Sequence, residues 1–208
     1  MNQPLSLKER QRRERQDLIL QVTRDMLFEQ GYHQMSMDEI ASRVGIAKGT
    51  LYLHFQRKED LVAELFAHSL SMFQDIIEKA QTRPGTAKER LVSVLEFMQL
   101  CFSDKSIHIV YALDNAEIAC ILRERFSLPV ARIKEGVAAL LEDGKRSGEF
   151  ATALPTSVMV QAFFSLLSPV VYSRLLREDP QLTAEDLSEH LRHIYFQGIA
   201  KENREGQS

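Results

Sequence analysis

Apolar residues recur at spacings of three and four along almost the whole chain of 208 residues, and no stretch shows the strict alternation of a half-buried strand. This spacing gathers the apolar side chains into one stripe along an α-helix, which is the side that packs against a core. Gly31, Gly45, Gly148 and the segment 82–85 interrupt the pattern, and helices are expected to end there. The sequence therefore predicts an all-α fold.

The expected helices cover residues 9–30, 37–44, 47–54, 58–80, 86–102, 107–113, 116–147, 155–177 and 184–201. Ser36 and Thr86 each stand three residues before a glutamate, which is the pattern of a capping box, and Thr183 is expected to cap the last helix. Pro129 is expected to kink or divide its helix, because proline lacks an N–H donor. The helix at 155–177 is expected to continue through Pro169 as one element.

Composition is that of an ordinary globular protein, with 44% hydrophobic and 26% charged residues and enough length for one or two domains. The first 15 residues are polar and basic and lack the apolar core of a secretory signal, so a cytoplasmic protein is expected. Cys101 and Cys120 have apolar neighbours and are expected to be core residues in a reducing compartment. The uncharged stretch at 150–173 contains two prolines and several polar residues, so no membrane span is expected.

Residues 37–55 have the size and spacing of a helix-turn-helix, in which a glycine turn joins two short helices. Ala41 is small where the helices must cross, and Leu51 and Phe55 are expected to anchor the second helix on the core. Gly49 has no side chain, which lets the helix backbone approach a phosphate closely. The side chains left for the outer face are Lys48, Thr50, Tyr52 and His54. This arrangement suits docking into the major groove of DNA.

The net charge of −3 does not by itself indicate a nucleic-acid-binding protein, but the distribution of charge is informative. Basic residues are concentrated near the N-terminus, at Lys8, Arg10, Arg12, Arg13 and Arg15. This placement suits an arm that contacts phosphates. A solvated helix start is the alternative interpretation.

These segments resemble the TetR family, the tetracycline-repressor family of bacterial regulators. The resemblance is carried by Ile19, Leu27-Phe28, Gly31-Tyr32, Ser36, Ile40-Ala41, Val44-Gly45-Ile46, Lys48-Gly49-Thr50-Leu51-Tyr52, His54-Phe55 and Lys58-Glu59-Asp60-Leu61. Beyond these, only the helix lengths, the segment 148–150 and the overall size are similar. The resemblance implies an N-terminal three-helix helix-turn-helix DNA-binding domain with a basic arm at 1–57. It further implies a C-terminal helical effector-binding and dimerisation domain at 58–201 and a disordered tail at 202–208.

The resemblance also implies which residues contact DNA. Those on or beside the reading surface are Ala47, Lys48, Gly49, Thr50, Tyr52 and His54, and those implied to contact phosphates are Ser36 and Lys58. Met35, Ala47 and Leu53 depart from residues common in the family, so base preference does not transfer. Two roles are open to Leu53, namely contact with a thymine methyl group or cover for the sugar backbone.

The C-terminal domain is expected to form a homodimer, because one helix-turn-helix reads only a few base pairs and two copies across a palindrome supply specificity. The expected interface combines helices 155–177 and 184–201. Its apolar residues are Val158, Phe163, Leu167, Val171, Leu175, Leu187, Leu191, Ile194 and Tyr195. The alternative is that both helices complete the core of a single chain.

The resemblance implies an effector pocket enclosed by the middle helices. Candidate lining residues are Phe97, Met98, Cys101, Phe102, Tyr111, Asn115, Cys120 and Phe164. Each of them has the alternative of being an ordinary core residue. Because no dense set of buried charges is evident and apolar cavities suit hydrophobic ligands, the expected effector is apolar or aromatic.

Other chemistry is scarce in the sequence. It contains no glycine-rich phosphate loop, paired catalytic carboxylate motif or nucleophile elbow, so an enzyme is not expected. His190 and His193 share a helix face, but two ligands are too few for a stable metal site, and neither a metal nor a cofactor is expected.

Together these observations predict a DNA-binding transcriptional repressor. It is expected to bind double-stranded, palindromic operator DNA as a homodimer and to be released by a small-molecule effector. Two alternatives stay open. One is a regulator of the same fold that activates transcription or answers to a protein partner, and the other is a helical binding module or enzyme that does not bind DNA.

Overall fold

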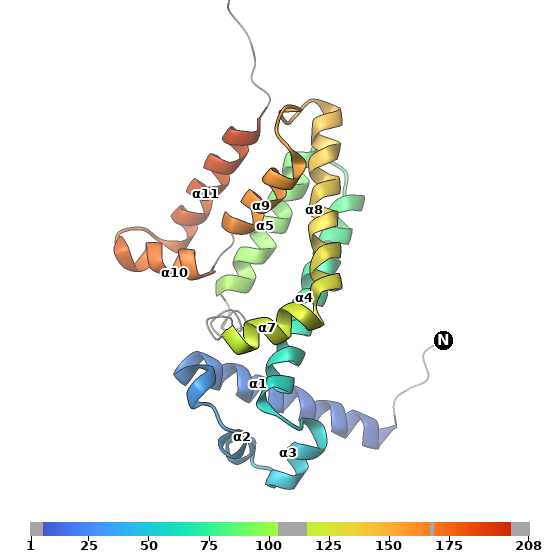
Figure 1. Cartoon of the computed structure of the whole chain (residues 1–208), viewed down its shortest axis with the longest axis vertical. Coiled ribbons are helices and arrows are strands. Elements are labelled where there is room, and N and C mark those ends of the chain that lie inside the picture. Colours follow the sequence, from blue (N-terminus) through green and yellow to red (C-terminus); the bar gives the residue numbers. More distant parts are fainter. Residues whose placement is uncertain (1–5, 104–115, 167–168, 201–208) are drawn as a thin grey trace, which may run out of the picture. The chain divides into compact units, whose positions relative to one another are not determined.

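The computed structural model describes residues 6–103, 116–166 and 169–200, and the regular elements in these ranges are helices (Figure 1). Within these ranges, β-type backbone pairing is limited to one antiparallel bridge between Phe150 and Ala200. The prediction of an all-α fold is confirmed. Among the described helices, none combines the length and the hydropathy needed to cross a lipid bilayer. The helix expected at 107–113 lies outside the described residues.

The described residues form two compact units. The first contains α1 (Leu7–Gln34), α2 (Met37–Val44), α3 (Lys48–His54), α7 (Ala116–Arg125) and the part of α4 (Lys58–Thr82) up to Ser69. The second contains the rest of α4, α5 (Ala87–Ser103), α8 (Ser127–Ser147), α9 (Thr156–Leu166), α10 (Pro169–Glu178) and α11 (Ala184–Ile199).

Each unit has its own apolar core. Fully buried residues of the first unit include Ile19, Met26, Ile40, Leu51, Leu61 and Leu65. Those of the second include Leu91, Leu95, Val137, Leu140 and Phe163. Leu61 and Leu65, Leu91 and Leu95, and Val137 and Leu140 show the three- and four-residue spacings that the sequence pattern predicts for helices that bury one side.

α1 begins before the expected residue 9, because Ser6 caps it. The Ser6 Oγ accepts a hydrogen bond from the Glu9 N–H at 3.3 Å, and the Glu9 carboxylate accepts one from the Ser6 N–H at 2.9 Å. The expected interruption at Gly31 is confirmed. This residue has a φ of 76°, a backbone conformation that favours glycine, and residues 32–34 follow beyond the kink.

α2 begins after Ser36 as expected, but its capping box is only half formed. The Glu39 N–H donates to the Ser36 Oγ at 3.2 Å. The Glu39 carboxylate, however, accepts hydrogen bonds from the side chains of Gln30 and Arg43, each at 3.0 Å. The second half of the predicted box is therefore wrong, because partners on α1 and α2 engage this carboxylate.

Two proline residues lie in the first turns of helices. Pro129 divides the helix expected at 116–147, and it lies in the first turn of α8, where its missing N–H would have no partner within the helix. The continuous helix expected at 155–177 is wrong, because α10 begins as a new helix at Pro169. Inside a continuous helix this proline would remove a hydrogen bond and clash with the preceding turn.

The start of α5 is held to the end of α8. The expected capping box at Thr86 is confirmed by reciprocal hydrogen bonds with Glu89 of 2.9 and 3.1 Å. In addition, the Glu149 carboxylate accepts hydrogen bonds from the N–H groups of Ala87 and Lys88, each at 3.0 Å. Partial burial acts to raise the pKa of Glu149, but these hydrogen bonds outweigh it and hold the pKa below its usual value.

Gly144 permits a close approach between α8 and the chain that follows it. A Cβ atom at this position would collide with the Phe150 ring and would lie 3.0 Å from the Ala87 Cβ. Phe150 is 2% exposed and stacks on Phe196 of α11, with the ring centroids 6.4 Å apart. The ring is therefore enclosed by α5, α8 and α11.

Candidate nucleic-acid interface

A tight glycine turn sets α3 against α2. Gly45 has a φ of 75° and ends α2, and the Ile46 N–H donates to the Ala41 carbonyl at 3.0 Å. Ala41 and Leu51 are buried, as the sequence predicts for the point where the two helices cross. This places Lys48–His54 as a short second helix, which is the geometry of a helix-turn-helix.

The outer face of α3 is formed largely by the residues expected there. Ala47, Lys48, Gly49 and Tyr52 are exposed, and Thr50 and His54 are half-buried. Ser36, expected to contact phosphate, is exposed at the start of α2, where its Oγ already accepts a hydrogen bond from Glu39. The exposed residues leave a surface that can lie in a groove of DNA.

Lys48 carries its own counter-ion. Its Nζ lies 2.5 Å from the Asp38 carboxylate on α2, and both side chains are more than half exposed. The hydrogen bond to Asp38 raises the pKa of Lys48. This role of Asp38 could not be predicted from the sequence, because Asp38 stands ten residues before Lys48 on a different helix and no helical spacing connects the two.

The Lys58 ammonium group donates hydrogen bonds to the protein backbone in this structure. Its Nζ donates to the carbonyl oxygens of Tyr32 and Met35, at 3.2 and 3.5 Å, and lies 4.2 Å from the centroid of the Tyr32 ring. The Tyr32 hydroxyl donates to Glu59 at 2.5 Å. Partial burial acts to raise the pKa of Glu59, but this hydrogen bond and the nearby positive charges lower it overall. Lys58 thus anchors the end of α1 to the start of α4, a role that the family resemblance did not imply.

The basic residues of α1 act on the end of α3. Partial burial lowers the pKa of His54, and the positive charges of Arg12 and Arg15 lower it further. Both arginines are exposed, and within the described residues neither forms an ion pair. Arg12 and Arg15 are therefore available to a phosphate backbone beside the reading helix.

The residues expected at a dimer interface divide into two groups. Val158 and Ile194 are 58% and 64% exposed, and Leu175 and Leu191 are half-buried. Three others are buried in the chain itself: Phe163, Leu187 and Tyr195. For these three the core alternative holds, because they already pack within the chain and have no surface for a partner. Leu167 and the Val171 side chain lie outside the described residues.

Tyr195 shows why these residues belong to the core. The centroid of its ring lies 5.7 Å from that of the Phe163 ring, and its hydroxyl donates to the Met159 carbonyl at 3.0 Å. Burial raises the pKa of Tyr195 well above its usual value. The contact joins α11 to α9 within one chain.

Few of the expected effector-pocket residues lie in the described part of the structure. Phe97 and Phe164 are half-buried side chains of α5 and α9. Cys120 is exposed on α7, so the expectation of a core cysteine there is wrong. The side chains outside the description are those of Met98, Cys101, Phe102, Tyr111 and Asn115.

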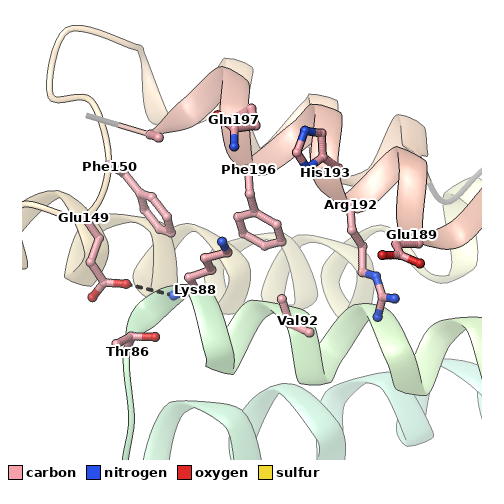
Figure 2. A pocket seen from close by; sticks show the side chains of 11 residues that line it. Thr86, Lys88, Val92, Glu149, Phe150, Glu189, Arg192, His193, Phe196 and Gln197 are labelled. Carbon is pink, nitrogen blue, oxygen red and sulfur yellow. Dashed lines mark hydrogen bonds between the residues drawn. The ribbon is translucent and has the colours of Figure 1, made fainter. Parts of the chain in front are cut away.

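A groove of about 590 Å³ lies between α5, α11 and the segment after α8 (Figure 2). In it, the Lys88 ammonium lies 5.7 Å from the centroid of the Phe196 ring. Arg192 lines the same groove and pairs with Glu96 at 3.0 Å, while Glu189 adds a negative charge. This groove could not be anticipated from the sequence, because its walls come from the separate segments 86–92, 149–150 and 189–200.

Comparisons with known proteins agree with this geometry. Residues 19–65 match the family model described as bacterial regulatory proteins, tetR family. The chain is 27% identical over 191 residues to the fatty acid metabolism regulator protein of Bacillus subtilis, covering 91% of this chain and 98% of that protein. It is 24% identical over 171 residues to the regulator UidR of Escherichia coli, covering 77% and 83%.

Solved structures show the same likeness. FadR from Bacillus halodurans, a fatty acid degradation regulator, matches with a TM-score of 0.74 at 25% identity, covering 90% of this chain and 97% of that one. FadR from Bacillus subtilis in complex with stearoyl-CoA matches with a TM-score of 0.72 at 26% identity, covering 88% and 98%. These relatives are transcriptional regulators and not enzymes. The helix-turn-helix, the all-helical fold and the matched family model together show that this chain is a DNA-binding member of the TetR family of transcriptional regulators.

Proposed function

We propose that this chain is a repressor that binds a palindromic operator as a homodimer and leaves it when an acyl-CoA binds. The exposed outer face of α3, with Arg12 and Arg15 beside it, carries the first part of the proposal. The likeness to the FadR proteins, one of them in complex with stearoyl-CoA, supports a regulator that responds to an acyl-CoA. We keep the boundaries 1–57 and 58–201 as the proposed division between DNA binding and effector response.

Two copies are needed because a single α3 spans only a few base pairs. The two reading helices are expected to enter successive major grooves, roughly 34–36 Å apart or a small multiple of that distance. Val158 of α9 and Ile194 of α11 support the dimer, because they are large apolar side chains left in water on helices that pack together. Burying such side chains against a second copy is favourable.

The effector class follows from the relatives. The FadR structure from Bacillus subtilis is a complex with stearoyl-CoA. The Bacillus subtilis protein that this chain matches in sequence is a fatty acid metabolism regulator. A long acyl chain agrees with the apolar ligand expected from the sequence. Phe97 and Phe164, which are half-buried in the second unit, stay the proposed contacts of such a chain. α4 supplies a route to the DNA-binding head, since it is one helix of 25 residues that belongs to both units.

Titration of the protein with stearoyl-CoA on a bound fragment of its own genome tests this function. Fluorescence anisotropy is expected to show operator affinity falling by about 5- to 150-fold, the usual range of allosteric coupling. Free coenzyme A is the control and is expected to have little effect. If neither stearoyl-CoA nor stearate changes the affinity, the effector assignment is wrong, while DNA binding itself stands.

A second function has one observation in its favour. The transcriptional activator FasR of Mycolicibacterium smegmatis is 29% identical over 85 residues, covering 41% of this chain and 39% of that protein. A reporter gene placed behind the selected operator separates the two functions. Expression that falls when this protein is supplied supports repression, and expression that rises supports activation.

A further inference from the structure

Leu53 is the most exposed large apolar side chain in the described part of the molecule, with 82% of its surface accessible. Leu51, two residues before it on α3, is completely buried. Successive helix residues are about 100° apart around the axis, so Leu53 lies about 160° round from Leu51. Leu53 therefore occupies the outermost position of α3, directed away from the core.

The surroundings of Leu53 make the centre of this face narrow and apolar. Gly49 lies one turn earlier on the same side, and a Cβ atom there would meet nothing within 4 Å. Tyr52 and His54 lie about 100° to either side of Leu53 and form polar borders. When a helix lies in the major groove, its outermost residue faces the base edges, whereas the residues on its flanks face the sugar–phosphate walls.

The chemistry of leucine selects one group on those base edges. The major groove presents hydrogen-bond donors, acceptors and a single type of apolar group, the C5-methyl of thymine. Leucine can neither donate nor accept a hydrogen bond, so the methyl group is the partner from which it gains. Of the two roles open to Leu53, cover for the sugar backbone suits a residue on the flank of α3, and Leu53 is not on a flank.

We propose that Leu53 determines specificity by packing against the methyl group of one thymine in each half-site. This assignment rests on the proposed function, because it requires α3 to enter the major groove. The fold places no demand on the position, since Leu53 makes no part of the core. Substitution there changes the reading surface and leaves the packing of the helix-turn-helix intact.

Deoxyuridine scanning tests the assignment, because deoxyuridine differs from thymidine only by the missing methyl group. An operator selected from random duplexes by the full chain is resynthesised with one thymine replaced at a time. One position per half-site is expected to lose affinity roughly fourfold, the ratio for a single methyl group taken out of water, and replacement in both half-sites roughly 15-fold. Leu53→Ala is expected to bind the thymine operator more weakly and to be indifferent to deoxyuridine at that position.

Leu128→Ala is the matched control, because Leu128 is 73% exposed on α8 in the second unit. This substitution should leave the sensitivity of binding to deoxyuridine unchanged. The assignment is overturned if no thymine position is sensitive in the original protein. It is also overturned if Leu53→Ala keeps the sensitivity, since another side chain then contacts the methyl group. Both results leave the proposed function standing, because the operator is still bound. If the full chain enriches no duplex at low salt, the proposed function fails and this assignment fails with it.

Discussion

Replacing Lys58 by methionine tests whether its ammonium group serves the fold of the DNA-binding head or the DNA. Methionine keeps most of the apolar stem and removes the contacts to the Tyr32 and Met35 carbonyls and to the Tyr32 ring. A hydrogen bond from a charged group contributes about 1.5–3 kcal/mol and a cation–π contact about 0.5–1 kcal/mol. Both hydrogen bonds are long and Lys58 is only half-buried, so we expect a total loss of about 1–3 kcal/mol in the free energy of unfolding.

Urea unfolding and the salt dependence of operator binding separate the two roles. A lost phosphate contact flattens the slope of log affinity against log salt by about 0.9, so Lys58→Met is expected to lower stability and leave this slope unchanged. Arg12→Gln is the control, because Arg12 is exposed and is expected to show the opposite behaviour. If Lys58→Met flattened the slope by about one and left the unfolding midpoint unchanged, the anchoring role would be refuted.

Three further predictions concern charge and association. Asp38→Asn removes the counter-ion of Lys48 and is expected to tighten binding to random duplex and steepen its salt dependence; an unchanged slope in anisotropy titrations would count against it. Glu149→Gln is expected to lower the free energy of unfolding by about 1–2 kcal/mol at neutral pH, because a charged acceptor of two amides is lost. The folded-state pKa of Glu149 is below the usual 4.5, so its contribution is present above that value and is lost as the pH falls through the lowered pKa. Urea unfolding should therefore show the gap between the two proteins closing in acid, and a gap that widened would contradict the role. Ile194→Glu is expected to weaken the homodimer in sedimentation experiments, whereas Leu128→Glu should not; equal effects would argue against an interface at α11.

Features that depend on neighbouring residues in the sequence could be predicted. The turn at Gly45 and the capping box at Thr86 are determined by backbone conformation and by side chains three residues apart. The start of α10 at Pro169 was missed, although the physical reason lies in the same local chemistry. There the uncharged, apolar stretch on both sides favoured a single helix over the break that proline requires.

Contacts between elements could not be predicted in this way. Lys58 meets the Tyr32 carbonyl across 26 residues, and no spacing within either helix indicates this contact. Periodicity also marks an apolar side without showing what covers it. Phe163 and Val158 belong to the same uncharged helix, yet one is completely buried in its own chain and the other is 58% exposed. The packing of α8 and α11 on α9 distinguishes them.

The contact between Gly144 and Phe150 has a consequence for the evolution of this segment. Because the Phe150 ring occupies the space where a side chain at 144 would lie, the two positions share a fixed volume. A methyl group gained at one must be matched by volume lost at the other, since overpacking costs about 1–3 kcal/mol. We therefore expect the two positions to covary among homologous chains, with alanine or a larger residue at 144 accompanied by a smaller side chain at 150. Either change alone is costly, because a smaller residue at 150 leaves a cavity and a larger residue at 144 meets a buried ring.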